Sequence, residues 1–265
     1  ISNSDPWDNL KFDIAGIGEV QRKLFGTLYN TYNFFALYAN IDEYTVDGRS
    51  DLDRSQLAEI DLWILSKLHS LLQEVDGHYS DYEPTKACRA IDSFVGDQLS
   101  NWYVRRSRRR FWKGDMTADK QAAYQTLHQC LLVVSQLMAP VAPFFSDWLY
   151  RNLDFRGSET SPASVHLSIL SDADPQVIDK DLEQRMEYAQ RISSLVLSLR
   201  KKAKQRVRQP LQKILLPVLD SDFQRRVEAV KDIILEEVNV KEIEYLTDDS
   251  FFSKQIKPNF KTLGR

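Results

Sequence analysis

Apolar residues recur at steps of three and four along most of the chain, and this spacing constrains the fold more than any other feature. Between residues 57 and 75 they occupy one side of a helix, at Leu57, Ile60, Ile64, Leu68, Leu71 and Val75. Such a stripe is typical of an amphipathic helix that packs against other helices. The chain is therefore predicted to be mainly α-helical.

Prolines and a glycine divide the first half of the chain into further helices. Residues 17–39 are apolar nearly all round, which predicts a central buried helix. Pro84 and Pro143 each suit the first position of a helix, whereas Gly114 and Pro140 suit a helix end. Because the connections are short, we expect an antiparallel α-helical bundle over residues 14–153.

The remaining chain has a different organisation. Residues 154–175 are polar and contain proline and serine, so they are predicted to be a connection. A long helix over 178–199, a strand over 211–219, a helix over 223–237 and a strand over 240–246 predict a small α/β unit within residues 176–265. Both ends of the chain stop abruptly, which indicates a piece of a longer polypeptide, truncated in its last unit.

Composition excludes several protein classes. The chain is 43% hydrophobic with only 9 Gly and 9 Pro among 265 residues, so a disordered or collagen-like chain is excluded. It has no apolar run of membrane-spanning length and no signal peptide at its start, and we expect no membrane partner. Cys88 and Cys130 show no metal or disulfide spacing, which favours free thiols in the cytoplasm.

Charge is strongly segregated along the chain. The formal net charge is −3, yet residues 98–113 and 200–213 contain only bases among their charged side chains. Such segregation is costly through self-repulsion, and it indicates a polyanionic partner at two places.

The first basic segment combines arginines with aromatic residues. At helical spacing one face is shared by Asn101, Arg105, Arg108, Arg109 and Trp112, with Trp102 and Arg106 beside it. Arginine forks bind phosphates, and flat rings stack on unpaired bases, so the pattern favours RNA binding. The alternative is structural: Trp102, Tyr103 and Phe111 would be core residues, with the arginines solvating a helix end. We expect Tyr103 and Arg106 to be partly buried.

The second basic segment is less specific. Its bases also complement the dipole of a helix C-terminus, so a structural role stays open. The candidate RNA-binding residues in this segment are Arg200, Lys201, Lys202, Lys204, Arg206 and Arg208.

Motifs for catalysis and metal binding are missing. The chain contains no phosphate-binding glycine loop, no Gly-x-Gly-x-x-Gly and no Gly-x-Ser-x-Gly. The four histidines form no i, i+4 pair that could hold a metal. We therefore predict no catalytic residue, no metal site and no cofactor in this chain.

Three segments carry a resemblance to a known family. They are NWYVRRSRRRFWKG, APVAPFFSDWLYRNL and SLRKKAKQRVRQPLQKI, and they resemble the anticodon-binding region of class Ia aminoacyl-tRNA synthetases, most closely the isoleucyl branch. The opening SNSDPWDNLKFD resembles the stretch just after that family's Lys-Met-Ser-Lys-Ser loop, so residues 1–13 would be a linker remnant. The resemblance covers essentially all of the chain.

The resemblance implies a tRNA-recognition module of a cytoplasmic ligase that joins isoleucine to its tRNA. That enzyme uses ATP and magnesium, but its His-Ile-Gly-His-type and Lys-Met-Ser-Lys-Ser motifs and its editing domain are absent here, so the fragment would be non-catalytic. The expected partners are the anticodon stem-loop of isoleucine tRNA and the enzyme's own catalytic domain, in a monomer. A valyl or leucyl module, and a helical protein-interaction scaffold with basic docking strips, remain alternatives.

The expected contacts divide between bases and phosphates. Unpaired RNA bases are recognised on aromatic and guanidinium planes, so the anticodon loop is assigned to Asn101, Trp102, Arg105, Arg109 and Trp112. Arg108, Arg110 and Lys113 would bind phosphates, and the second basic segment would hold the stem or the flanking backbone.

Overall fold

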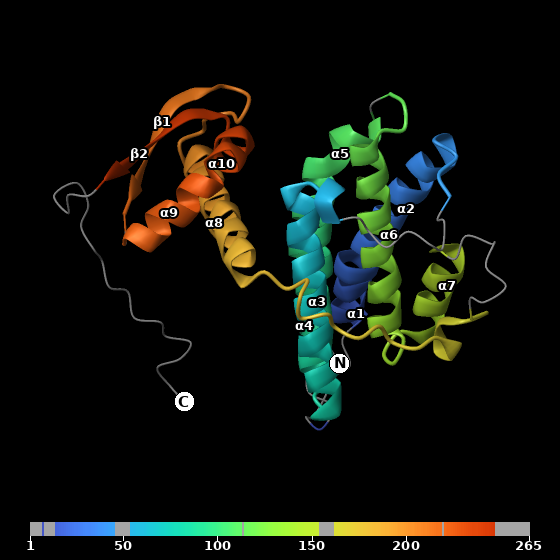
Figure 1. Ribbon diagram of the computed structural model, residues 1–265. Helices are drawn as coiled ribbons and strands as arrows, with labels where there is room; N and C mark the ends of the chain where they lie inside the picture. Colours follow the sequence, from blue (N-terminus) through green and yellow to red (C-terminus); the bar gives the residue numbers. More distant parts are fainter. Residues whose placement is uncertain are drawn as a thin grey trace. The chain divides into compact units, whose positions relative to one another are not determined.

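The structure is a computed structural model that describes Trp7 and residues 14–45, 54–112, 114–153, 162–218 and 220–246 (Figure 1). Its contacts divide the chain into two compact units, Ile1–Lys180 and Asp181–Arg265. The prediction of a mainly α-helical chain with a small α/β unit is confirmed. Within the described ranges no helix is long and apolar enough to cross a membrane. Apart from Trp7, the predicted linker remnant lies outside the described residues.

The first unit is a helical bundle. Figure 1 shows its helices α3, α4 and α6 running side by side, and α3 contacts both of the others. Two π-helical segments, η1 and η3, join neighbouring α-helices into longer rods. The elements are α1 (Ile14–Val20), η1 (Gln21–Phe25), α2 (Gly26–Ile41), the 3₁₀ turn η2 (Arg54–Gln56), α3 (Glu59–Ser80), α4 (Pro84–Ser93), η3 (Phe94–Val104), α5 (Arg105–Trp112), α6 (Ala118–Met138), α7 (Pro143–Leu153) and the 3₁₀ turn η4 (Val165–Leu167).

The first helical rod is less buried than its sequence predicts. Leu28 and Phe35 of α2 face the core, but Ile17 and Leu37 are exposed. The expectation of a central buried helix is therefore wrong: the rod lies at the side of the bundle and buries one face. Because apolar residues also occupy its exposed face, the sequence pattern overestimates its burial.

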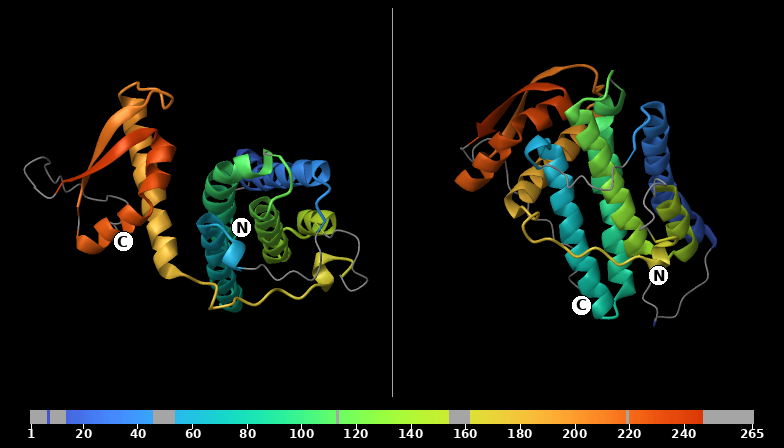
Figure 2. Two further views of the ribbon diagram at one scale, coloured as in Figure 1. Left: turned by 45° about the horizontal axis from the view of Figure 1, so that its top comes forward. Right: turned by 45° about the vertical axis from the view of Figure 1, so that its right-hand side comes forward.

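The second unit is a βαβ arrangement preceded by the long helix α8 (Lys180–Lys202). Strands β1 (Leu211–Pro217) and β2 (Val240–Leu246) pair in parallel, with Ile214 opposite Ile243 (Figure 2). Parallel neighbours need a crossover, and α9 (Ser221–Ala229) with α10 (Lys231–Val238) supplies it. The predicted helix over 223–237 is thus two helices, which meet at Val230.

Residues 162–179, here called the strap, belong to the first unit. They cross the bundle helices and are held by side chains of α3, α6 and α7 (Figure 2). The backbone N–H of Asp174 donates to Nδ1 of His69 at 2.9 Å, and that of Asp179 donates to Oγ of Ser66 at 2.8 Å. The described part of the predicted connection is therefore bound to the bundle, and residues 154–161 lie outside the described residues.

We expect the first unit to lose stability in acid, because His69 holds the strap to α3. Burial lowers the pKa of His69; Asp174 opposes this shift and Arg54 adds to it. His69 therefore binds a proton more readily in the unfolded chain than in the folded one. Its contribution to the free energy of unfolding is complete above about pH 6.5 and is lost as the pH falls through the lowered pKa. Urea unfolding at pH 7.5 and pH 5 measures this loss.

The control is His69→Asn, which keeps an acceptor for Asp174 but does not titrate. Its stability should fall less between the two pH values than that of the parent chain. Equal falls in both proteins would show that His69 does not carry the effect.

Candidate nucleic-acid interface

The helix α5 and the turn before it present a basic surface to solvent. All five residues that helical spacing places on one face are exposed, and Trp112 retains 55% of its surface. This set, here called the basic face, consists of Asn101, Arg105, Arg108, Arg109 and Trp112. Nε of Arg105 donates to the Asn101 carbonyl at 2.8 Å, which fixes one guanidinium along the helix. The face combines an exposed aromatic ring with three cations.

Trp102 does not belong to this exposed surface. Only 5% of it is accessible, because η3 packs against α2, α3 and α4. Its ring lies under two guanidinium groups, with Cζ of Arg105 at 5.7 Å and Cζ of Arg106 at 5.5 Å from the ring centroid. The expectation that Trp102 stacks on an RNA base is therefore wrong. Arg106 is half-buried, and Tyr103 is fully buried.

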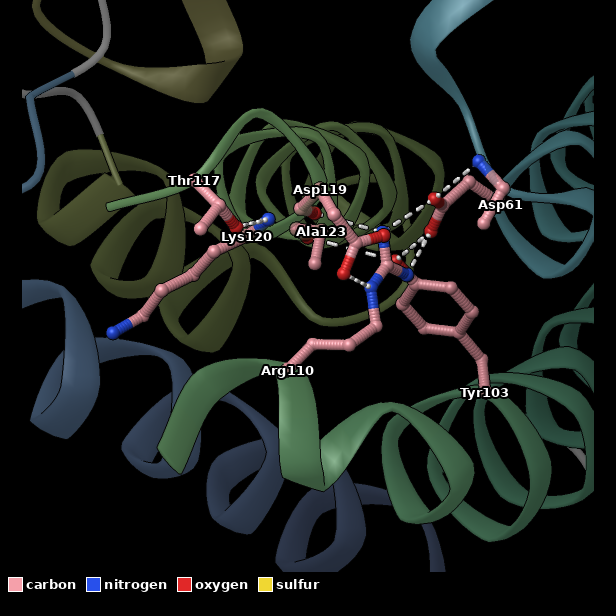
Figure 3. Close-up of polar contacts among 8 residues, drawn as sticks. Asp61, Tyr103, Arg110, Thr117, Asp119, Lys120 and Ala123 are labelled. Carbon is pink, nitrogen blue, oxygen red and sulfur yellow. Dashed lines mark hydrogen bonds and ion pairs between the residues drawn. The ribbon is translucent and has the colours of Figure 1, made fainter. Parts of the chain in front are cut away.

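Arg110 points into the bundle and binds a buried carboxylate (Figure 3). Its Nη1 and Nη2 donate to the two carboxylate oxygens of Asp61, each at 2.7 Å, and Asp61 has no accessible surface. The Tyr103 hydroxyl donates to the same carboxylate at 2.7 Å, and Nε of Arg110 donates to Asp119 at 3.0 Å. The bidentate pair with Asp61 joins α5 to the start of α3, and the contact with Asp119 joins α5 to the start of α6.

The pairing removes Arg110 from the candidate phosphate contacts. Burial favours the neutral guanidine, but the hydrogen bonds that Arg110 donates to Asp61 and the neighbouring negative charges outweigh it and raise the pKa of Arg110. Burial and the Asp61 charge raise the pKa of Tyr103 well above its usual range, so its hydroxyl stays a donor. The expectation that Arg110 binds phosphate is wrong, because its donors are engaged inside the protein.

A second buried cation fixes the loop that follows α5. Nζ of Lys120 lies 2.6 Å from a carboxylate oxygen of Asp42 and donates to the Gly114 carbonyl at 3.2 Å. Gly114 has φ = +49°, a left-handed conformation that glycine adopts without a steric penalty. The Tyr124 hydroxyl also donates to Asp42 at 2.5 Å. Burial alone would raise the pKa of Asp42, but these two partners lower it overall.

The second basic segment lies at the end of α8 and in the loop before β1. Five of its six candidate RNA-binding residues are exposed, and they are Lys201, Lys202, Lys204, Arg206 and Arg208. Arg200 differs from them: it is only 3% exposed and its guanidinium donates to backbone carbonyls of the loop. The expectation that Arg200 contacts RNA directly is therefore wrong. Lys113, the last candidate of the first segment, lies outside the described residues.

Metal-ligand clusters and the two cysteines were the remaining features with chemical potential in the described parts of the chain. These parts contain no group of three or more His, Cys, Asp or Glu side chains that could hold a metal ion. Burial raises the pKa of the Cys88 and Cys130 thiols, so neither is poised as a nucleophile. The two basic surfaces are the features that a functional interpretation has to explain.

Sequence reasoning missed the acidic partners of Arg110 and Lys120. The core stripe through Val95, Leu99 and Tyr103 continues to Ser107 and Arg110, and this continuation was the available signal for a buried arginine. Asp61 carried no such signal, because an acid in the first turn of a helix commonly serves as a cap. Indeed it also accepts from the Ala58 backbone N–H at 3.1 Å.

Both basic segments lie within a region that matches a known protein family. Residues 61–215 match the family described as the anticodon-binding domain of tRNA ligases. The match covers more than half of the chain and includes both basic segments. The chain belongs to this family. Its anticodon-binding domain therefore comprises the bundle from α3 onward, the strap, α8 and most of β1.

Individual relatives agree with this family over the whole chain. It is 54% identical to the isoleucine–tRNA ligase of Porphyromonas gingivalis over 265 residues, and 53% identical to that of Cytophaga hutchinsonii over 266. Isoleucine–tRNA ligase 2 of Bacillus cereus is 38% identical over 99% of the chain. The chain spans about a quarter of the length of these curated relatives.

Proposed function

We propose that this chain is the tRNA-recognition module of an isoleucine–tRNA ligase and that it binds the anticodon stem-loop of isoleucine tRNA. The observation that carries the proposal is the basic face of α5, which lies within the matched anticodon-binding domain and exposes three arginines beside a tryptophan. Single-stranded RNA is recognised by stacking on such planes and by charge on its phosphates.

The roles of the exposed residues follow from their chemistry. Asn101, Arg105, Arg109 and Trp112 offer hydrogen bonds and planar groups to loop bases, and Arg108 offers charge to a phosphate. The second basic segment contributes further cations for the backbone, which carry no base information. With about six phosphates neutralised, the logarithm of affinity should fall against the logarithm of salt concentration with a slope of about −4.

In the complete enzyme, ATP and magnesium would activate the amino acid in the cytoplasm. The residues of this chain do not fit that task, because it lacks both ATP-handling motifs and a described cluster of metal ligands. The part played by this chain is to bind and orient tRNA for the catalytic domain.

Two substitutions test the assignment of the loop bases. Replacing Arg105 or Trp112 by Ala should weaken binding of isoleucine tRNA by about 1–3 kcal/mol, because each removes a stacking plane from the basic face. Binding of labelled tRNAs for isoleucine, valine and leucine, measured side by side, gives both affinity and preference. The matched control is Phe144→Ala, which removes a more exposed aromatic ring from α7, outside the basic face.

The outcomes separate the alternatives. A preference for valine or leucine tRNA would assign the module to another ligase of the class. Acidic proteins that bind the chain while tRNA does not displace them would favour the interaction scaffold. If both substitutions leave affinity and preference unchanged in a folded protein, the basic face of α5 does not read the anticodon.

A further inference from the structure

Arg200 is a buried cation that no carboxylate neutralises within the described part of the chain. Its Nη2 donates to the backbone carbonyls of Arg206 at 2.6 Å, Val207 at 3.3 Å and Gln209. Nε and Nη1 of the same side chain are buried and have no hydrogen-bond partner among the described residues. A buried guanidinium is costly unless its charge and its donors are satisfied. Among the described residues, the hydrogen-bond partners of the Arg200 guanidinium are therefore backbone carbonyls of the segment 206–209.

The carbonyls that Arg200 attracts determine where the loop's N–H groups point. In a trans peptide the carbonyl of one residue and the N–H of the next point in opposite directions. Because the carbonyls of Arg206 and Val207 turn toward Arg200, the N–H groups of Val207 and Arg208 turn away from it. Asn239 reinforces this orientation by donating Nδ2 to the Val207 carbonyl at 2.8 Å.

The outward N–H groups are available for a ligand. Among the described residues, the backbone N–H groups of Val207 and Arg208 donate to no acceptor, and the whole segment 201–210 is exposed. The third attracted carbonyl, of Gln209, precedes Pro210, which has no N–H to orient. Consecutive N–H groups that point the same way form a concave site for anions.

Lys204 adds a second indication of function. It has φ = +55°, a left-handed conformation in which glycine is usual after a helix. A lysine at this position adds steric strain, which glycine would avoid. Lys204, Arg206 and Arg208 are all exposed in this loop, so the segment that holds the outward N–H groups also contains three cations.

We propose that the loop 203–209 is a phosphate-binding loop for the RNA backbone. The N–H groups of Val207 and Arg208 and the side chains of Lys204, Arg206 and Arg208 hold one phosphodiester group, and Arg200 is the positioning residue that orients them. This inference rests on the proposed tRNA binding, and it assigns Arg200 a role through the loop carbonyls rather than a contact with RNA.

The direct test follows backbone amide signals of the full chain by NMR as tRNA is added. The signals of Val207 and Arg208 should shift on addition of tRNA, and should shift in the same direction at much higher concentrations of inorganic phosphate. Shifts with phosphate but none with tRNA would overturn the assignment to the RNA backbone. If tRNA binds and shifts only signals of α5, the inference is wrong while the proposed function stands; if tRNA does not bind, the proposed function itself fails.

Arg200→Lys tests the positioning role because it keeps the charge but loses the fork. Affinity for tRNA should fall about tenfold, as expected when a charge-assisted hydrogen bond is lost. The salt slope should also become shallower by about 0.7, the share of one phosphate contact. Wild-type affinity and slope in Arg200→Lys would contradict the proposal, since a role limited to charge predicts no change.

Lys204→Gly keeps the test informative if Arg200→Lys does not fold. Glycine relieves the left-handed backbone, so thermal stability should rise or stay equal while tRNA affinity falls several-fold. A variant that gains stability and keeps full affinity would contradict a binding role for Lys204. Lys241→Ala, which removes an exposed charge from β2, is the matched control and should change neither quantity.

Discussion

Replacing Arg110 by Ala should lower the free energy of unfolding of the chain by about 3–5 kcal/mol, the cost of leaving one member of a buried ion pair alone. Asp61 is completely buried, so without Arg110 its carboxylate keeps, among the described residues, the Tyr103 hydroxyl and the Ala58 N–H as donors. Urea unfolding followed by circular dichroism measures the loss. The matched control is Arg109→Ala, which removes an exposed arginine from the same helix and should cost within about 0.5 kcal/mol.

A double substitution separates this explanation from general damage to the helix. Arg110→Met combined with Asp61→Leu removes both charges and fills the space with apolar groups, so it should recover part of the lost stability. If the double variant is as unstable as Arg110→Ala with Asp61→Ala, the ion pair is not the origin of the effect.

Removing the three arginines of the basic face together should abolish most of the tRNA affinity. Each exposed cation contributes charge to the RNA contact, so changing Arg105, Arg108 and Arg109 to Ala should lower affinity by a factor of about 100–1,000. The salt slope should become shallower by about 0.7, because Arg108 is the one phosphate contact among the three. Fluorescence titration with tRNA at several salt concentrations measures both quantities.

Net charge alone could weaken RNA binding, so the control must change it equally. Three exposed bases outside α5 serve this purpose, each paired with an acid three or four positions earlier in the chain, and they are Lys23, Lys86 and Arg191. Their combined replacement by Ala should leave affinity within about threefold, because exposed pairs of this kind add little and the long-range field is screened. Equal losses in both triple variants would assign the effect to net charge instead of to the basic face.

The helical architecture could be read from the sequence because it depends on local spacing. The stripe predicted from Leu57 to Val75 lies in α3 from Ile60 onward, and the prolines at 84 and 143 begin α4 and α7 as predicted. Strand order could also be predicted, since a strand, a helix and a strand in succession imply a parallel pair with a crossover. These features need only neighbours along the chain.

The division of arginines into exposed and buried could not be read so directly. Arg109 and Arg110 are adjacent and identical in type, yet one is exposed and the other binds Asp61, which lies 49 positions earlier. Arg200 was misassigned for a related reason, because its carbonyl partners lie in a loop that has no periodic pattern. In both cases a tertiary contact determines whether the arginine is buried, whereas the sequence pattern indicates only that a positive charge is present.

The strap has a consequence for how the chain is synthesised. Ser66 and His69 of α3 obtain their partners from Asp179 and Asp174, which lie 113 and 105 residues later. A ribosome adds about 5–20 residues each second, so α3 waits roughly 5–20 s for the strap to emerge. During that interval the emerging bundle exposes a polar seam along α3. Ser66 and His69 gain these partners only when translation has reached the start of α8. By then the whole of α5 has left the ribosome.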